Sequence, residues 1–318
     1  MDLIYTNSER VDQGALSAYA FDLSYGASEN DFAMVIGMAE AILDYGAFIY
    51  MEGTEYGGIV DAKNAITNSE SIKYMGRTWH GVMNSKVIQP DAGENYLVVS
   101  GDANDILSML IVRLGLSELF TAKKEASGID IQNYKFRRYC KGYDGAADML
   151  SANGAKLKIV WKNQTVELSA VPIDDYSKNP VDGDTTMLTV EQHKNKVNHL
   201  VCLGKGELAE REVIHLYADQ NGNICDTQFY TGVDEVTDIY ENSNTEDLRS
   251  DGVKRFKELL DSDKAEITLP ANDVLTYDIG DIVEASDVKT GVSAKASVTQ
   301  KIVRINNGAI STEYKTGR

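Results

Sequence analysis

The sequence has few cysteines and no long apolar run, and both shortages narrow the class of protein. Among its 318 residues there are three cysteines, an odd number with no Cys-x-x-Cys pair, so we expect no disulfide framework and a reducing compartment. No apolar run approaches the ~20 residues that a helix needs to cross a bilayer, and Met1–Tyr5 lacks the basic and apolar regions of a signal peptide. We therefore expect no membrane span and synthesis in the cytoplasm.

Basic residues are also scarce. The chain carries 31 Lys and Arg against 49 Asp and Glu, a formal net charge of −18. Because binding to phosphates needs clustered cations, we expect neither specific nor sequence-independent binding of nucleic acid. An acidic surface suits the wall of a DNA conduit, where like charges keep a genome from sticking, but it also serves ordinary solubility. Both explanations remain open at this point.

The familiar sequence signatures of catalysis and metal binding are missing. There is no Gly-x-Ser-x-Gly elbow and no His-Glu-x-x-His pair. Residues 204–207 lack the spacing of a phosphate loop, and residues 219–223 lack the glycine and glutamate positions of a calcium loop. His199 and His215 would face each other if their strands pair, yet their spacing is not a zinc pattern. We assign no catalytic residue, no cofactor and no metal, and expect no enzyme.

The most informative stretch that is present begins at residue 48. Two strand-like runs, Phe48–Met51 and Tyr56–Val60, flank a four-residue turn that contains glycine, which predicts an antiparallel hairpin. Ile72–Met75 supplies a third strand. From Thr78 the apolar spacing becomes helical, and Pro90 blocks any extension beyond it. The pattern therefore predicts a hairpin, a strand and a short helix.

Four residues of this stretch are candidate assembly positions. Gly57 and Gly58 cost backbone entropy inside a strand, so they indicate a bulge, a sharp bend or the close approach of another chain. Arg77 and Trp79 belong to a family likeness given below, although core packing explains Trp79 equally well.

The remaining periodicity predicts a mainly β chain with three longer helices. We expect helices near 103–114, 143–152 and 247–260, starting in the first case after Asp102. Strands are expected at 18–24, 31–36, 156–161, 165–170, 185–192, 197–203, 212–218, 226–230, 301–305 and 309–314, with turns at Asn221-Gly222 and Asn307-Gly308. The polar segment 174–184 is the best linker, so we place a domain boundary there.

Several runs resemble the Gp37-like tail hub family of siphoviruses and Firmicute prophages. Glu52–Asp61 followed by Gly76–Trp79 carries the first likeness. Asn198–Leu208 with Val213–Asp219 resembles the central segment of that family, and Tyr277–Val283 resembles its last domain. The resemblance covers nearly the whole chain, and none of its motifs is a catalytic fingerprint.

The resemblance implies a virion structural protein similar to the baseplate hub or tail tip of tailed phages. Its fold class would be mainly β with α/β insertions (α+β): a tube-type β-barrel in residues 1–97, an inserted α/β domain in 98–182, and a second β-rich barrel domain in 183–318 with a helical insert near 247–260. A homotrimer would then present six similar barrels, which match a hexameric tail tube above and a threefold tip below.

The implied partners are tail tube and distal tail proteins and tail fibre or tip proteins. The implied location is the virion tail, assembled in the bacterial host cytoplasm, and a siphovirus tail and a contractile device both fit. Two other function classes stay open. A cell-wall carbohydrate-binding module would use exposed aromatics, which the 17 tyrosines permit, and a glycosidase would need two of the 49 acidic residues to meet in a cleft. A glycan array tests the first and peptidoglycan zymography the second.

Overall fold

The computed structural model describes residues 2–26, 29–40, 42–65, 69–178, 181–182, 189–191, 197–243, 245, 247–260, 266–270, 276–287 and 289–317. Two compact units make up the chain. The first contains residues 1–189 and 267–316, and the second contains residues 190–266 with the last two residues. The limits of these units do not coincide with the predicted boundaries at 97/98 and 182/183, so the three-domain division stays a prediction.

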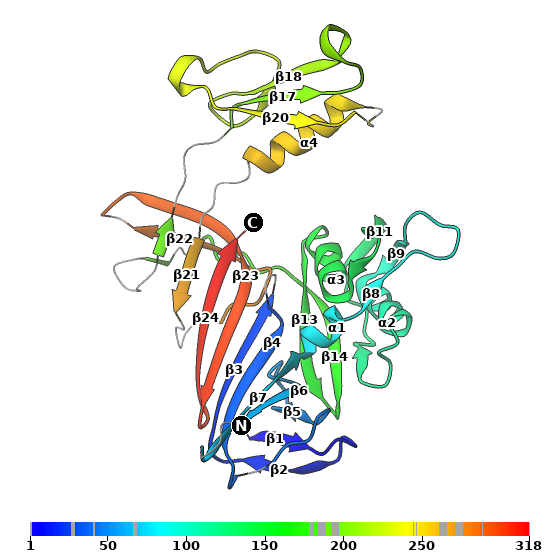
Figure 1. The fold of residues 1–318 in the computed structure, drawn as a ribbon, viewed down its shortest axis with the longest axis vertical. Helices are drawn as coiled ribbons and strands as arrows, with labels where there is room; N and C mark the ends of the chain where they lie inside the picture. The colour runs from blue at the N-terminus through cyan, green and yellow to red at the C-terminus, as the bar shows by residue number, and fades with distance from the viewer. Residues whose placement is uncertain are drawn as a thin grey trace. The chain divides into compact units, whose positions relative to one another are not determined.

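A 13-stranded sheet runs through the first unit and joins both ends of the chain (Figure 1). The main strand order is β16-β21-β24-β23-β3-β4-β7-β6-β5-β1-β2, and β22 pairs with β15 and β23. The strands are β1 (Leu3–Thr6), β2 (Asp12–Leu16), β3 (Tyr19–Gly26), β4 (Asp31–Gly37), β5 (Phe48–Tyr50), β6 (Gly57–Ala65), β7 (Ser71–Thr78), β15 (Val181–Asp182), β16 (Thr189–Glu191), β21 (Glu266–Pro270), β22 (Ile282–Asp287), β23 (Val292–Asn306) and β24 (Ala309–Gly317).

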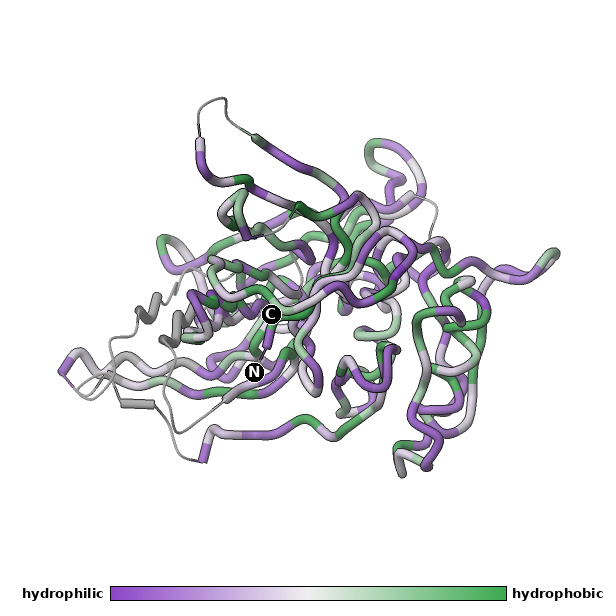
Figure 2. Tube along the Cα trace, turned by 90° about the horizontal axis from the view of Figure 1, so that it is seen from below, coloured by the Kyte–Doolittle hydropathy of each residue, from purple (hydrophilic) through white to green (hydrophobic). Residues whose placement is uncertain are grey.

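The period of two residues along these strands sets the core. Side chains at alternate positions point to opposite faces of a sheet, and Figure 2 shows hydrophobic and hydrophilic residues interspersed along the chain. Phe21, Met34, Tyr74 and Val303 are all buried on one face, and they come from four neighbouring strands. Since β23 pairs antiparallel with β3, residues from the two ends of the sequence share this core.

The mainly β fold class is confirmed, but the two tube-type barrels are not. Among the described residues the strand order begins at β16 and ends at β2, and these two strands do not pair, so no closed barrel is found there. Strands from residues 3–78 and from 266–317 instead belong to one sheet. The physical reason is the long β23, which is shared between β3 on one side and β24 on the other.

The middle of the chain adds helices and small sheets to the first unit. Its elements are α1 (Trp79–Asn84), β8 (Val87–Ile88), β9 (Val98–Asp102), α2 (Ala103–Arg113), β10 (Phe120–Ala122), β11 (Asp130–Lys135), β12 (Cys140–Lys141), α3 (Gly142–Ser151), β13 (Ala155–Lys162) and β14 (Thr165–Pro172). Strands β10, β14 and β13 form a three-stranded sheet, while β9 pairs with β11 and β8 with β12. One core contains both Trp79 and Trp161, so it extends across the predicted boundary at 97/98.

The second unit is a four-stranded sheet with one helix against it. Its elements are β17 (His199–Leu203), the 3-10 helix Leu208–Glu210, β18 (Val213–Ala218), β19 (Ile224–Cys225), the 3-10 helix Gly232–Asp234, β20 (Thr237–Glu241) and α4 (Leu248–Leu260). Leu200, Cys202 and Leu216 on one face of the sheet pack against Leu248 and Phe256 of the helix.

Most predicted elements are present within one or two residues of their expected limits. The hairpin β5–β6, the strand β7 and the helix α1 follow the expected order, and Thr78 caps α1 by accepting a hydrogen bond from the Gly81 amide. Asp102 caps α2 as expected. The turn at Asn307-Gly308 joins β23 to β24, and both residues have positive φ, as hairpin turns of this kind require.

One expected strand is absent, and the linker predicted at 174–184 stays a prediction. The strand predicted at 226–230 is absent, because the pairing with β18 ends at Cys225. The Asp226 carboxylate instead binds Arg249 of α4, with Oδ1 2.7 Å from Nη2 of the arginine. The predicted linker is partly ordered, since Asp175 bridges to Ile282 and β15 pairs with β22. Residues 179–180 and 183–184 of the linker, and 185–188 and 192 of the strand predicted at 185–192, lie outside the described residues.

Candidate assembly site and its buried charge network

The two candidate glycines lie where backbone and side chains approach each other closely. A Cβ atom on Gly57 would lie 2.5 Å from the Ile49 carbonyl oxygen and 2.8 Å from Nε1 of Trp79. On Gly58 it would lie 2.2 Å from the Arg77 carbonyl oxygen. All three distances are shorter than real Cβ contacts, so contacts within the chain already require glycine at both positions. An additional role of these glycines in assembly stays a prediction.

Trp79 is fully buried in an aromatic cluster. Its ring stacks on Trp161 with centroids 4.9 Å apart, and Phe48 packs edge-on against it at 5.6 Å. Tyr50 stacks on the other tryptophan at 4.3 Å. These contacts support core packing as the role of Trp79, and they join the predicted hairpin to the edge strand β13.

Arg77 is the candidate residue whose side chain reaches solvent. Its guanidinium binds Asp61 through two nearly parallel hydrogen bonds, Nε to Oδ2 at 2.7 Å and Nη2 to Oδ1 at 2.8 Å. Asp61 is the extra residue of a β-bulge between Val60 and Ala62, so the bulge lies three residues after Gly58 rather than at the glycines. The pair fixes the bulge geometry, and hydrogen bonds from Arg77 lower the pKa of Asp61 against the opposing effect of burial.

A buried charge network lies beside the hairpin turn. Nζ of Lys301 lies 2.7 Å from Oε1 of Glu55 and 3.5 Å from Oδ1 of Asp278, and the lysine side chain is 8% exposed. Burial lowers the pKa of Lys301, but the negative charges around it, Glu55 first, outweigh burial and raise it. The lysine is therefore charged, and its carboxylate partners keep it so inside the fold.

A second buried lysine extends the network to the strand β13. Nζ of Lys156 lies 2.5 Å from Oδ1 of Asp281, 2.9 Å from Oδ2 of Asp174 and 3.6 Å from Oδ2 of Asp278. The buried carboxylate of Asp281 also accepts hydrogen bonds from the amides of Asp174 and Asp278. Because Asp278 contacts both lysines, it links the two halves of the network and fixes the turn before β22.

His80 lies at the inner end of this network. It is 3% exposed, its ring packs against Tyr25 at 4.6 Å and Tyr143 at 5.1 Å, and its Nε2 is 3.7 Å from Oε2 of Glu55. Nδ1 of His80 has no hydrogen-bond partner among the residues that the structure describes. Burial lowers the pKa of His80 to about 4, which outweighs the opposing charge of Glu55. The residue is therefore neutral at physiological pH.

This neutral histidine predicts acid sensitivity of the first unit. The pKa of His80 is about 4 when folded against 6.5 as the ordinary value, so the unfolded chain binds the proton first as pH falls. Stability is then lost between pH 6.5 and 4, by about 3 kcal/mol at most from this group. We expect the urea midpoint of the wild type to fall more steeply over that range than the midpoint of His80→Gln. Parallel profiles for the two proteins would contradict the assignment.

Sequence reasoning did not select the lysines and carboxylates of this network. One indication was available: Lys301, Val303 and Ile305 alternate along a single strand, and all three are buried on the core face. A lysine on the apolar side of a strand predicts a buried partner, since an unpaired charge there is expensive. Its partners Glu55 and Asp278 lie far away in sequence, so no local pattern identifies them.

The two histidines of the second unit do face each other. Nε2 of His199 lies 2.8 Å from Nδ1 of His215, and Nδ1 of His199 lies 2.6 Å from Oε1 of Glu235. Across the described ranges, no group of three or more His, Cys, Asp or Glu is arranged to hold a metal ion. Nor does any helix in the described part of the chain have the length and apolarity to cross a membrane.

Comparison with solved structures matches the whole chain. The prophage MuSo2 43 kDa tail protein from Shewanella oneidensis superposes with a TM-score of 0.59 at 10% identity, covering 100% of this chain and 98% of that one. This chain has the fold of phage tail proteins. Prophage tail protein gp18 from Listeria monocytogenes gives a TM-score of 0.56 at 12% identity, with 100% and 94% covered.

A further match lies in a larger assembly. A chain in the structure of the phage P2 baseplate in its activated conformation superposes with a TM-score of 0.52 at 10% identity, covering 96% of this chain and 90% of that one. No family model matches the sequence, and no curated protein matches it. Membership of the Gp37-like family therefore stays a prediction.

Proposed function

We propose that this chain is a structural component of a phage or prophage tail, in the baseplate hub or tail tip. The observation that carries the proposal is the extent of the likeness. Nearly all of this chain and nearly all of each matched chain superpose. Low identity with a shared fold is expected where geometry, rather than a fixed set of reacting groups, is the selected property.

The proposed mechanism is geometric. Three copies form a ring that connects a hexameric tail tube to a threefold tip. The ring lines the DNA channel with an acidic wall, and it transmits the signal of attachment toward the tip. Partners are tail tube, distal tail and tail fibre or tip proteins, and no reaction is catalysed. The net charge of −18 supports the acidic wall, because like charge would limit adhesion of the genome.

The first test is the solution mass of the purified chain by light scattering over a concentration series. Three times the 35.0 kDa chain mass is expected for the hub. A persistent monomer would restrict ring formation to the presence of tail partners, and would give weight to a carbohydrate-binding module. Cryo-electron microscopy of a tail that carries this chain is the decisive second test: a ring with a basic, closed centre would refute the proposal.

A further inference from the structure

A turn between β11 and β12 presents an aromatic residue in an unfavourable backbone conformation. The Cys140 amide donates to the Arg137 carbonyl oxygen at 3.3 Å, which closes a four-residue turn, and Tyr139 occupies its third position with φ of 57°. Glycine or asparagine is preferred there, because a bulky side chain is strained at positive φ. Strain of this kind concentrates at functional positions, where the side chain itself is needed.

The same turn is exposed and positively charged, in a strongly acidic protein. We define the basic loop as residues 135–141, which contain Lys135, Arg137, Arg138 and Lys141, all exposed. Tyr139 is 58% exposed, and the Arg138 guanidinium lies 5.4 Å from its ring centroid. Tyrosine and arginine are among the residues that most often dominate the binding energy of an interface.

Exposed apolar residues flank the basic loop on both sides. Val98 lies directly opposite Lys135, and Val87 directly opposite Lys141, so each valine shares a face with a lysine. Both valines are 47% exposed. Phe136 anchors the loop, because its side chain is buried and packs edge-on against Tyr134. Arg137 is paired with Asp148 of α3 at 2.6 Å, so the positive charge that this loop offers to a partner comes from Lys135, Arg138 and Lys141. The result is a firmly anchored surface with an aromatic centre, apolar flanks and a positive charge.

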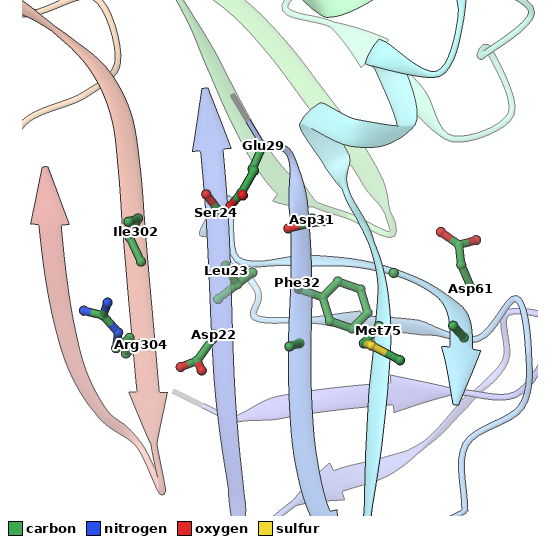
Figure 3. A pocket seen from close by; sticks show the side chains of 13 residues that line it. Asp22, Leu23, Ser24, Glu29, Asp31, Phe32, Asp61, Met75, Ile302 and Arg304 are labelled. Carbon is green, nitrogen blue, oxygen red and sulfur yellow. The ribbon is translucent and has the colours of Figure 1, made fainter. Parts of the chain in front are cut away.

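A complementary surface lies on the large sheet of the same unit. The face of β3, β4, β6, β7 and β23 opposite the core contains a hollow of about 530 Å³ (Figure 3). Small residues form much of its floor, because Ala33 and Ala62 lie on either side of Met75 in neighbouring strands. We call this surface the sheet hollow, and no described element covers it. Its lining also includes the apolar side chain of Ile302.

The rim of the sheet hollow is acidic. Asp22, Glu29, Asp31 and Asp61 line it, against a single arginine, Arg304. Asp61 is paired with Arg77 and Arg304 with Glu313, but among the described residues the other three carboxylates have no ion pair. Burial and the charge of Glu29 raise the pKa of Asp31, as expected for a carboxyl group that lacks a cation.

From these two surfaces we infer a contact between copies of this chain: the basic loop of one copy, led by Arg138 and Tyr139, enters the sheet hollow of the next. The inference rests on the proposed tail assembly and names the surfaces through which it would form. Charge complementarity selects the occupant, because the loop is basic and the rim is acidic. The hollow provides apolar lining for the tyrosine ring and free carboxylates for Arg138 and Lys141.

This contact joins two different surfaces, so it is heterologous. A head-to-tail contact of that type generates a ring when its rotation closes, whereas a contact of a surface with itself generates only a pair. The inferred contact is therefore of the kind that a threefold hub requires. Because its charged groups are exposed, it should weaken as salt increases.

The test is sedimentation equilibrium of the full chain with four variants. Arg138→Glu and Asp31→Lys should each weaken association about tenfold or more, because each sets like charges against each other. The double variant reverses both sides of every contact and should restore the wild-type mass. Tyr139→Asn should weaken association by a similar factor while the melting temperature stays the same or rises, because asparagine tolerates the positive φ.

A matched control reverses a charge elsewhere. Lys254 of α4 has a side chain that is 75% exposed, so Lys254→Glu should leave the mass unchanged. A wild-type trimer whose mass neither single reversal alters overturns the contact and leaves the proposed function standing. A wild type that is monomeric at every concentration also overturns this contact, and the imaging of assembled tails then decides the proposed function by itself.

Discussion

Replacing Lys301 by methionine is expected to destabilise the first unit by about 3–5 kcal/mol, the cost of breaking a buried ion pair by removal of one partner. The lysine side chain is 8% exposed and Glu55 is 17% exposed, so the carboxylate would remain buried without its cation, 2.7 Å from the lost Nζ. Calorimetry or urea unfolding followed by circular dichroism measures the loss. The two compact units are expected to unfold separately, so the transition of the first unit is the relevant one.

A double variant distinguishes charge pairing from simple packing. Lys301→Met combined with Glu55→Gln removes both charges, and we expect it to recover much of the stability lost in the single variant. Asp278 retains the second lysine of the network, Lys156, so its own partner is not lost. If the double variant is as unstable as the sum of its single changes, the ion pair does not stabilise this part of the fold.

Local sequence patterns predicted the elements well but not how distant strands pair. The hairpin β5–β6 and the caps of α1 and α2 follow from residues that are close in sequence. The pairing of β23 with β3 joins Asn306 to Ala20, and nothing in either strand specifies the other. An alternating pattern of apolar residues predicts that a strand has one buried face, but it does not identify the strand that pairs with it. Two separate barrels were therefore expected where one large sheet is found.

The failed strand at 226–230 has a similar cause. Phe229 and Tyr230 favour strands by propensity, but propensity is weak when a tertiary contact competes. The pairing with β18 ends before Asp226, and the Asp226 carboxylate instead pairs with Arg249 of the later helix α4. The same limit applies to the candidate site: sequence identified Trp79 and Gly57 as unusual, while their mutual contact appears only in three dimensions.

Replacing Trp79 by alanine is expected to destabilise the first unit by about 3–5 kcal/mol, the usual cost of removing a large aromatic side chain from a core. The indole is fully buried between Trp161 and Phe48, so its removal leaves a cavity that rigid neighbours fill poorly. Circular dichroism is the suitable probe, since the variant removes one of only two tryptophan fluorophores.

The Trp79 variant also decides between the two roles predicted for this residue. A core role reduces the stability of the isolated chain, whereas an assembly role reduces association and leaves the stability of the monomer unchanged. Trp79→Phe is the matched control, because it keeps an aromatic ring against Trp161 and should recover part of the loss. An alanine variant with wild-type stability but impaired association would contradict the core role, and would restore Trp79 as an assembly residue alongside Tyr139.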